Sequence, residues 1–411
     1  MPTPSAAPTL TTTAPATRAT ERAWVGVAAA IFAIAWGGNE FTPLLVMYKR
    51  DGLPLATVDL LLFEYVLGII PALLIGGPLS DRYGRRPLMR PAPLVAAAGS
   101  LLLAFGAGSV PMLSAGRVLS GIALGLAMAV GSSWLKELSQ PPYTAGSAAG
   151  AGARRSAMSL TGGFGVGAGV AGVLAQWGPL PDTLPYLLNV ALCLGAAAWV
   201  LRAPETIVPQ PVTARLLDDL KVPAAANRRF RLVALPLSVW LFTSAATAYA
   251  IMPTLMMPKV QGAPIAFSAL ITVITLGCGF AVQSLARRLD RPGTLRLPVL
   301  GLCLTVTGML LATVASGALT LWLTVATAVL LGAGFGIGLV AGLLEIERMA
   351  RPDDLAGLTA VFYAVSYLGF GVPAVMAVLH QHAGFGYPAM FLALAAAAAG
   401  CLGLVTRAGR G

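Results

Sequence analysis

The sequence predicts an all-α integral membrane protein with twelve transmembrane helices in two six-helix halves around a central cavity. Of the 411 residues, 57% are hydrophobic and only 10% are charged, a composition too apolar for a soluble globular chain. The apolar residues also form twelve runs of roughly the 20 residues that a helix needs to cross a bilayer. The expected spans are residues 24–48, 55–76, 91–110, 111–134, 156–178, 183–202, 232–256, 264–286, 295–315, 318–343, 357–379 and 385–406.

The basic residues predict the orientation of these spans. Of the 27 lysines and arginines, 23 lie in alternate loops and tails, which accounts for the net charge of +11 without a nucleic-acid partner. Cytoplasmic loops are enriched in lysine and arginine, so we expect a multi-pass protein of the plasma (inner) membrane with both termini in the cytoplasm. Lys49 and Lys259 fall in the other, external loops.

A break rich in proline and arginine divides the chain. Residues 203–231 are expected to be a cytoplasmic linker between an N-terminal half at 23–202 and a C-terminal half at 232–407. Residues 1–22, rich in Pro, Thr and Ala, are expected to be a disordered cytoplasmic tail, and 408–411 a short second tail. We expect a monomer whose partners are the lipid bilayer, protons and a small-molecule substrate.

The sequence lacks the usual signs of an enzyme or a nucleotide-driven pump. No lysine follows a glycine, so the chain has no Walker-type phosphate loop. The four cysteines lie inside expected spans without C-x-x-C spacing, so they are expected to be buried apolar residues. We therefore expect no enzymatic activity, no cofactor and no metal site.

Three ionisable residues lie inside the expected spans: Glu40, Glu64 and Arg117. Each costs on the order of 3 kcal/mol at mid-bilayer. At about 1.5 Å per helical residue, their depths from the external ends are roughly 12, 13 and 9 Å, so the three could meet at one level. Two carboxylates facing one guanidinium would suit a proton carrier. The alternatives are a structural ion pair and a buried hydrogen-bonded anchor. Asp59 is expected to be solvated near the external end.

The segment at residues 77–86 reads Gly-Pro-Leu-Ser-Asp-Arg-Tyr-Gly-Arg-Arg. It fits G-x-x-x-D-R-x-G-R-R and closely resembles the loop between spans two and three in the major facilitator superfamily of secondary transporters. The resemblance implies a cytoplasmic gate in which Asp81 accepts hydrogen bonds from backbone amides at a neighbouring helix N-terminus. The alternative is that the arginines only set the topology. The gate residues would be Gly77, Asp81, Arg82, Gly84, Arg85 and Arg86.

Two further segments bear on this resemblance. Residues 113–125 resemble the fourth-span motif of the superfamily, which implies a proton-coupling role for Arg117. The fifth span lacks the proline of the Gly-Pro pair that proton antiporters of the superfamily often carry. Its glycines are expected to allow close helix packing. These glycines are Gly163, Gly167, Gly169 and Gly172.

The resemblance implies a transporter that works by alternating access between two related halves. The expected activity is proton-coupled export of a small hydrophobic or cationic compound, as in drug:proton antiporters. The alternatives are proton-coupled uptake of a small metabolite and a membrane sensor that does not transport. Polar and aromatic residues of the spans are the candidates for substrate contact. They are Trp36, Asn39, Asn189, Trp240, Tyr249, Tyr363 and Tyr367.

Overall fold

The computed structural model describes residues 22–145, 147–148, 150–207, 222–291, 293–351 and 354–409. Within these ranges, 11 helices are long and apolar enough to cross a membrane, and Leu184–Val200 is a shorter apolar helix. The described residues contain no strand. The predicted all-α fold with twelve membrane helices is therefore confirmed. Most of the expected N-terminal tail, residues 208–221 of the expected linker and residues 410–411 lie outside the described ranges.

The first six spans form one group of helices. Two of them are built from shorter helical segments, because a turn at Arg90 and Pro91 divides one and a π-turn divides the other. The first two spans are α2 (Ala23–Arg50) and α3 (Leu55–Tyr83). The third consists of α4 (Arg85–Met89) and α5 (Ala92–Ala104), and the fourth of α6 (Val110–Leu126), η1 (Ala127–Gly131) and α7 (Ser132–Leu138). The fifth and sixth are α8 (Ala151–Trp177) and α9 (Leu184–Val200).

The second six spans form the other group. A short 3-10 turn, η2 (Pro223–Ala226), precedes them. The seventh span consists of η3 (Phe230–Ala234), α11 (Leu235–Ala246), η4 (Thr247–Ile251), α12 (Met252–Met256) and η5 (Met257–Lys259). The next three are the single helices α13 (Pro264–Leu289), α14 (Arg296–Ala318) and α15 (Leu321–Met349). The eleventh consists of α16 (Leu355–Tyr367), η6 (Leu368–Gly371) and α17 (Val372–Ala383), and the twelfth is α18 (Tyr387–Ala408).

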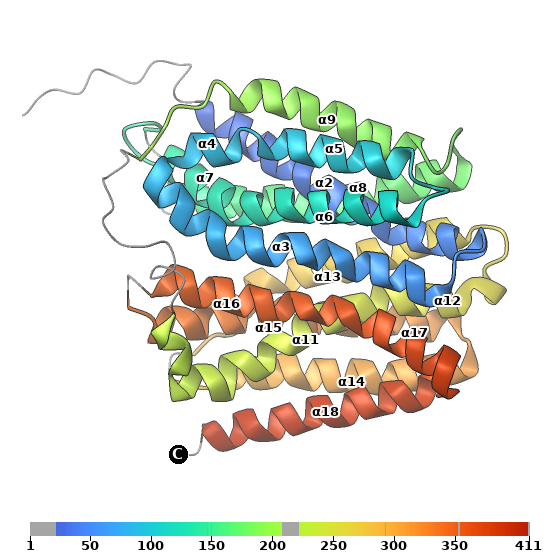
Figure 1. The fold of residues 1–411 in the computed structure, drawn as a ribbon. Coiled ribbons are helices and arrows are strands. Elements are labelled where there is room, and N and C mark those ends of the chain that lie inside the picture. The colour runs from blue at the N-terminus through green and yellow to red at the C-terminus, as the bar shows by residue number, and fades with distance from the viewer. Residues whose placement is uncertain are drawn as a thin grey trace, which may run out of the picture.

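The two groups lie against each other along their lengths (Figure 1). Inside the first group α2 packs on α8 and α3 on α6, and inside the second α14 packs on α15 and α18. Between the groups, α13 packs on α2 and α8, while α3 packs on α16 and α17. Figure 1 shows α4, α7 and the C-terminus at one end, which we call the basic end, and α12 and α17 at the other, which we call the opposite end.

The third span begins earlier than the sequence indicated. It was expected at residues 91–110, whereas its helices run from Arg85 to Ala104. Gly84 ends α3 with φ +96°, which favours glycine, and the chain returns to helix at the next residue. Residues 105–109 then connect to α6. The gate motif is therefore the junction of two helices rather than an extended loop.

Glycines allow backbones to approach closely in lipid-facing bundles. A Cβ on Gly121 of α6 would lie 2.0 Å from the carbonyl oxygen of Tyr65 on α3. Among the expected packing glycines of α8, Gly163 and Gly167 lie against the α2 backbone. Gly169 and Gly172 instead face α13 of the second group. The glycines of α8 thus allow it to pack closely on α2 of its own group and on α13 of the second group.

Two π-helical turns lie where the groups meet. η1 continues α6, and η4 continues α11. Met128 of η1 accepts a hydrogen bond from the Tyr367 hydroxyl on α16, with the hydroxyl oxygen 3.1 Å from the sulfur. η4 carries Tyr249, whose ring contacts that of Phe370 on η6. Single π-turns inside helices often mark functional sites, so this level of the bundle is a candidate region.

Candidate functional site

Glu40 lies in the second half of α2, and its side chain is fully buried. The Ser100 hydroxyl on α5 lies 3.1 Å from Glu40 Oε1, within hydrogen-bond distance. Glu40 Oε2 has no hydrogen-bond partner in the described part of the chain. The Trp36 indole N–H is buried and also has no hydrogen-bond partner among the described residues. Burying an unpaired carboxylate oxygen is costly, so Glu40 has spare capacity for a proton.

Arg117 on α6 is also fully buried, and its guanidinium packs between two aromatic rings. Its Cζ lies 4.5 Å from the ring centroid of Phe41 and 4.3 Å from that of Tyr65. Its Nε donates to the Leu61 carbonyl oxygen at 3.2 Å. Glu40 attracts the guanidinium electrostatically, although no direct ion pair joins the two within the described ranges. The charge of Arg117 is therefore held mainly by ring faces and a backbone carbonyl.

Glu64 stands apart from this pair. Its neighbour Tyr65 turns toward Arg117, and successive residues of an α-helix point about 100° apart. Glu64 is partly exposed, and one of its carboxylate oxygens is buried without a partner among the described residues. The structure brings Glu40 and Arg117 together, but the expected three-residue cluster does not form.

Asn189, expected to contact substrate, lies in a buried hydrogen-bond network beside Glu40. Its Nδ2 donates to the Ala33 carbonyl oxygen at 2.8 Å, which fixes the orientation of the amide. Its Oδ1 then faces the Ser100 hydroxyl at 2.8 Å. Gly37 leaves room for this contact, because a Cβ there would lie 2.6 Å from Asn189 Oδ1. Asn189 therefore positions Ser100 against Glu40.

An aromatic cluster lies where the two groups of helices meet, and it includes two of the expected substrate residues. Phe242 of α11 stacks on Tyr367 of α16 with ring centroids 4.3 Å apart and on Phe370 with centroids 4.9 Å apart. Tyr249 contacts Phe370. We call Phe242, Tyr249, Tyr367 and Phe370 the interface cluster. Phe242 is partly exposed, whereas Tyr249 and Tyr367 are buried.

The other candidate residues are spread along the spans. Asn39 is buried, accepts a hydrogen bond from Thr42 at 2.9 Å and donates to the Phe164 carbonyl oxygen of α8 at 3.4 Å. Trp36 packs its ring on Phe32. Trp240 buries an indole N–H that has no partner among the described residues. Tyr363 packs edge-on against Phe362. Trp36 and Asn39 thus lie on α2 near Glu40, away from the interface cluster.

A buried ion pair ties the groups together at the opposite end. Lys49 Nζ lies 2.6 Å from Asp59 Oδ1, and the side chains are 1% and 6% exposed. Lys49 also donates to the Thr254 hydroxyl of α12 at 3.1 Å, so the pair reaches from one group to the other. The expectation that Asp59 is merely solvated is wrong, because Lys49 folds over it from α2. Nearby, Gln176 Oε1 accepts hydrogen bonds from the backbone amides of Ile265 and Ala266.

The gate motif is organised around Arg85 rather than Asp81. Arg85 Nη1 lies 2.7 Å from Asp81 Oδ1 and Arg85 Nη2 lies 2.8 Å from Glu137 Oε1 at the end of α7. Ser80 also bonds to this guanidinium. The Asp81 side chain remains 63% exposed. The backbone-amide partners expected for Asp81 belong instead to Glu205, so that expectation is corrected.

Glu205 caps the N-terminus of α4. Its carboxylate accepts hydrogen bonds from the backbone amides of Arg85 and Arg86 at 2.9 and 2.8 Å, and from Thr206 at 3.0 Å. Burial alone would raise the pKa of the Glu205 carboxyl, but these backbone amides, with that of Ile207, hold it below its usual range. The carboxylate also sits beside Gly84, where a Cβ would lie 2.6 Å from Glu205 Oε2. Position 84 therefore favours glycine for two reasons: its positive φ angle and the close approach of the Glu205 carboxylate.

Several residues of these sites were not expected from the sequence. Glu137 and Glu205 lie far from the gate motif in sequence, so no local pattern marks them. Tyr65 had a signal: it precedes Gly68 by three residues, and both lie on the face of α3 that packs against α6. Phe242 and Phe370 have no such signal, because aromatic residues in apolar spans are usually packing or interfacial residues.

Comparison with known proteins agrees with this architecture. The crystal structure of a POT family transporter in complex with 5-aminolevulinic acid matches with a TM-score of 0.76 and 12% identity over 94% of this chain and 96% of that one. The crystal structure of the nucleoside transporter NupG matches with a TM-score of 0.71 and 12% identity over 95% and 99%. At such identity the likeness concerns the fold alone. No curated protein sequence is similar to the chain.

The sequence profile described as Major Facilitator Superfamily matches residues 25–372. This segment covers eleven of the twelve membrane helices wholly or in part. It includes the gate motif, Glu40, Arg117 and the interface cluster. The chain therefore belongs to the major facilitator superfamily of transporters.

Proposed function

We propose that this transporter couples proton movement to the export of a small hydrophobic or cationic compound by alternating access. One observation carries the proposal. The Ser100 hydroxyl has a single hydrogen and lies within hydrogen-bond distance of both Asn189 Oδ1 and Glu40 Oε1. Asn189 presents its oxygen, because its amide nitrogen is engaged with Ala33. If Ser100 donates to Asn189, the contact with Glu40 requires a proton on the Glu40 carboxyl. The network thus suits a protonated Glu40.

The electrostatic attraction between Glu40 and Arg117 would couple the protonation of Glu40 to the packing of α2 against α6. When Glu40 is charged, it attracts the guanidinium, and α2 is drawn toward α6. When Glu40 binds a proton, that attraction disappears, while the two ring faces and the Leu61 carbonyl continue to hold Arg117. The proton therefore changes the force between two helices, while Arg117, whose Nη1 has no hydrogen-bond partner among the described residues, keeps its contacts with the two rings and the carbonyl oxygen. Glu64 has no part in this step.

The interface cluster supports a hydrophobic or cationic substrate. Aromatic faces attract cations and stack on planar apolar groups. Phe242 offers such a face from the second group of helices and remains partly exposed where the groups meet. Tyr249 and Tyr367 border it with hydroxyl groups. An anionic substrate finds less support, because Arg117, which acts on Tyr249 of this cluster electrostatically, has its guanidinium packed against Phe41 and Tyr65.

We place the basic end in the cytoplasm, following the distribution of lysine and arginine. The opposite end would then face outward. Hydrogen bonds from Lys49 to Thr254 and from α13 to Gln176 cross between the groups at that end, which supports an outward gate that is shut in this conformation. The gate motif with Arg85, Asp81 and Glu137 lies at the cytoplasmic end, where it would hold the other gate during outward opening.

Export and its alternative, uptake, differ in the direction in which the substrate moves relative to the proton. The same proton site could serve uptake of a small metabolite by symport. A proton that moves down a membrane potential gains about 2.3 kcal/mol per 100 mV, which supports roughly fortyfold accumulation of an uncharged substrate in either direction. Exchange of one proton for one monovalent cation moves no net charge, so the pH gradient alone drives it.

Reconstitution tests the proposal. Purified protein is placed in proteoliposomes with an imposed pH gradient, and ethidium is followed by fluorescence as a planar lipophilic cation. Export predicts that ethidium accumulates on the acidic side and that protons leave that side as it does so. Movement of ethidium and protons in the same direction would favour symport. Ethidium flux that is indifferent to the pH gradient would overturn proton coupling.

A further inference from the structure

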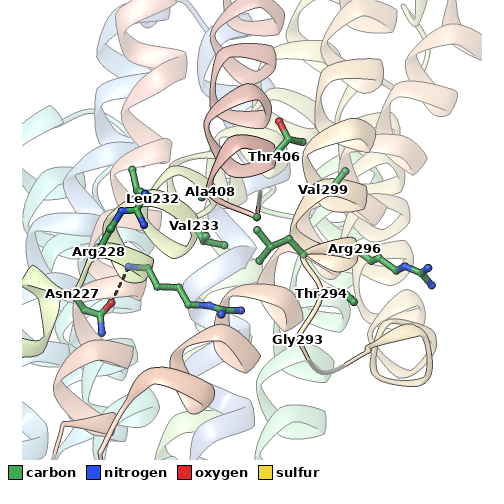
Figure 2. Close-up of a pocket in the computed structure, with 13 residues that line it drawn as sticks. Asn227, Arg228, Leu232, Val233, Gly293, Thr294, Arg296, Val299, Thr406 and Ala408 are labelled. Carbon is green, nitrogen blue, oxygen red and sulfur yellow. Dashed lines mark hydrogen bonds between the residues drawn. The ribbon is translucent and has the colours of Figure 1, made fainter. Parts of the chain in front are cut away.

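A basic cavity opens at the basic end of the second group of helices, away from the interface between the groups. Its volume is about 850 Å³, and it lies between the start of η3, the start of α14 and the end of α18 (Figure 2). Figure 2 shows Asn227, Arg228 and Leu232 on one side, Thr294, Arg296 and Val299 on another, and Thr406 from α18. None of the proposed transport steps uses these residues.

The charge of this cavity is not balanced by its neighbours. Arg229, which also lines it, is neutralised by Glu345, with Nε 2.7 Å from Oε2. Glu345 also pairs with Arg348, which in turn pairs with Asp290. Two arginines and two carboxylates thus balance, and none of the described lining residues is acidic. Arg228 and Arg296 remain exposed, with no ion pair among the described residues.

A second cavity of about 310 Å³ adjoins the first, and Arg296 lines both. Arg288 and Arg291 also line the second cavity, with Leu300 on its apolar side. The two cavities together form a basic surface at one end of α14. A doubly or multiply charged anion would find several guanidinium donors there, which match phosphate oxygens in geometry.

The walls of the cavities change from polar to apolar along the helices. Leu232, Val233 and Val299 line the inner part of the larger cavity. Farther along α14 and α18, Leu300 and Leu404 are 37% and 48% exposed on the outer surface of the bundle. An occupant with an anionic head and an apolar tail would therefore place the head near Arg228 and Arg296 and lay its tail on these leucines.

We infer that the cavity between η3, α14 and α18 binds the phosphate headgroup of an anionic phospholipid from the membrane leaflet at the basic end. Basic pockets between transmembrane helices are suited to such headgroups. A bound lipid would join the first turn of the second group to its last helix, since the cavity is lined by both. The inference concerns the lipid environment and holds whatever compound is transported.

The test compares anionic and zwitterionic lipid. Delipidated protein in dodecylmaltoside is mixed with dioleoylphosphatidylglycerol or dioleoylphosphatidylcholine, and bound lipid is measured by native mass spectrometry. Each arginine near an anionic headgroup contributes on the order of fivefold in affinity. Arg228→Gln with Arg296→Gln should therefore weaken phosphatidylglycerol binding roughly 30-fold. Phosphatidylcholine binding should change little.

The matched control is Arg154→Gln with Arg202→Gln, which removes the same charge from exposed arginines of the first group. This pair should leave phosphatidylglycerol binding within about twofold. Equal loss in both double variants would overturn the site, and so would full binding by Arg228→Gln with Arg296→Gln. Inorganic phosphate that protects the wild-type protein against thermal unfolding as well as phosphatidylglycerol does would overturn the assignment to lipid.

A second measurement needs no variant. A photoactivatable phosphatidylglycerol carrying its reactive group near the head is cross-linked to the wild-type protein, and the labelled peptides are identified. Labels at residues 227–233, 293–299 and 406–409 are expected. Labels confined to other segments would overturn the inference even if the variants failed to fold.

Discussion

Lys49 and Asp59 form an ion pair of 2.6 Å that is almost completely shielded from solvent. The pair joins α2 to α3, and a hydrogen bond from Lys49 to Thr254 extends it to α12 in the other group of helices. Removing one partner of a buried ion pair leaves an uncompensated charge and costs about 3–5 kcal/mol. The pair therefore holds α2, α3 and α12 together at the opposite end.

Lys49→Gln is expected to open that end more often, because Asp59 loses its partner. A cysteine at Thr247, whose buried hydroxyl has no partner among the described residues, reports the opening in a variant whose four native cysteines are replaced. Membrane-impermeant maleimide applied from that side should label it several-fold faster. Thr254→Val, which removes only the cross-group hydrogen bond, should have a smaller effect. Unchanged labelling with Lys49→Gln would show that the pair does not hold the gate.

Glu205→Gln is expected to lower thermal stability at pH 7 by roughly 1 kcal/mol, because the partly exposed carboxylate loses charge-assisted hydrogen bonds from backbone amides. The pKa of Glu205 is depressed in the folded protein. Its contribution is therefore present above the unfolded pKa of about 4.3 and is lost as the pH falls through the folded pKa. The gap between variant and wild type should close on acidification. Thermal unfolding in detergent from pH 7 to pH 3 measures how the difference in melting temperature between variant and wild type changes.

The control for this prediction is Glu347→Gln, a change at an exposed glutamate of α15. It should leave the melting temperature unchanged throughout the same range of pH. A stability difference for Glu205→Gln that stays constant down to pH 3 would contradict the capping role of the carboxylate.

Gly68→Ala is expected to destabilise the first group of helices. The added Cβ would lie 2.1 Å from the Val118 carbonyl oxygen, a backbone atom that cannot move without separating α3 from α6. Overpacking of this kind costs about 1–3 kcal/mol or more. Gly165→Ala on α8 is the control, since its Cβ would meet nothing within 4 Å. A fall in melting temperature that is equal for the two variants would argue against close packing at Gly68.

Phe242→Leu is expected to weaken binding of an aromatic cation, because it removes the partly exposed ring on which the cation would stack. Aromatic pairs are worth about 0.5–1.5 kcal/mol beyond the buried area, so the affinity for ethidium should fall roughly threefold to tenfold. Fluorescence titration measures it. Phe105→Leu, at a highly exposed ring beyond α5, should bind as the wild type does. Equal affinities for ethidium in the wild type, Phe242→Leu and Phe105→Leu would show that the interface cluster does not contact the substrate.

Much of the fold could be predicted from the sequence, because long apolar runs in a bilayer have few alternatives to helices. The gate motif also identified the family. The limits of the third span could not be predicted, since Gly84 separates two helices that apolarity alone does not resolve.

The candidate sites were less predictable because their contacts join distant segments. Depth along each span placed Glu40, Glu64 and Arg117 at one level, but helix rotation turns Tyr65 rather than Glu64 toward Arg117. Lys49 was assigned to a loop, yet it reaches back to Asp59. The partners of Arg85 and Arg86 come from Glu137 and Glu205, whose positions depend on the packing of the whole group.

The central claim is that Glu40 carries the coupled proton, and Glu40→Gln tests it most directly. Glutamine resembles the protonated carboxyl group, since its amide can donate to Ser100 while remaining uncharged. In proteoliposomes the variant should still exchange ethidium across the membrane at equilibrium, but a pH gradient should no longer drive accumulation. Accumulation by Glu40→Gln to the wild-type level under the same gradient would contradict the account.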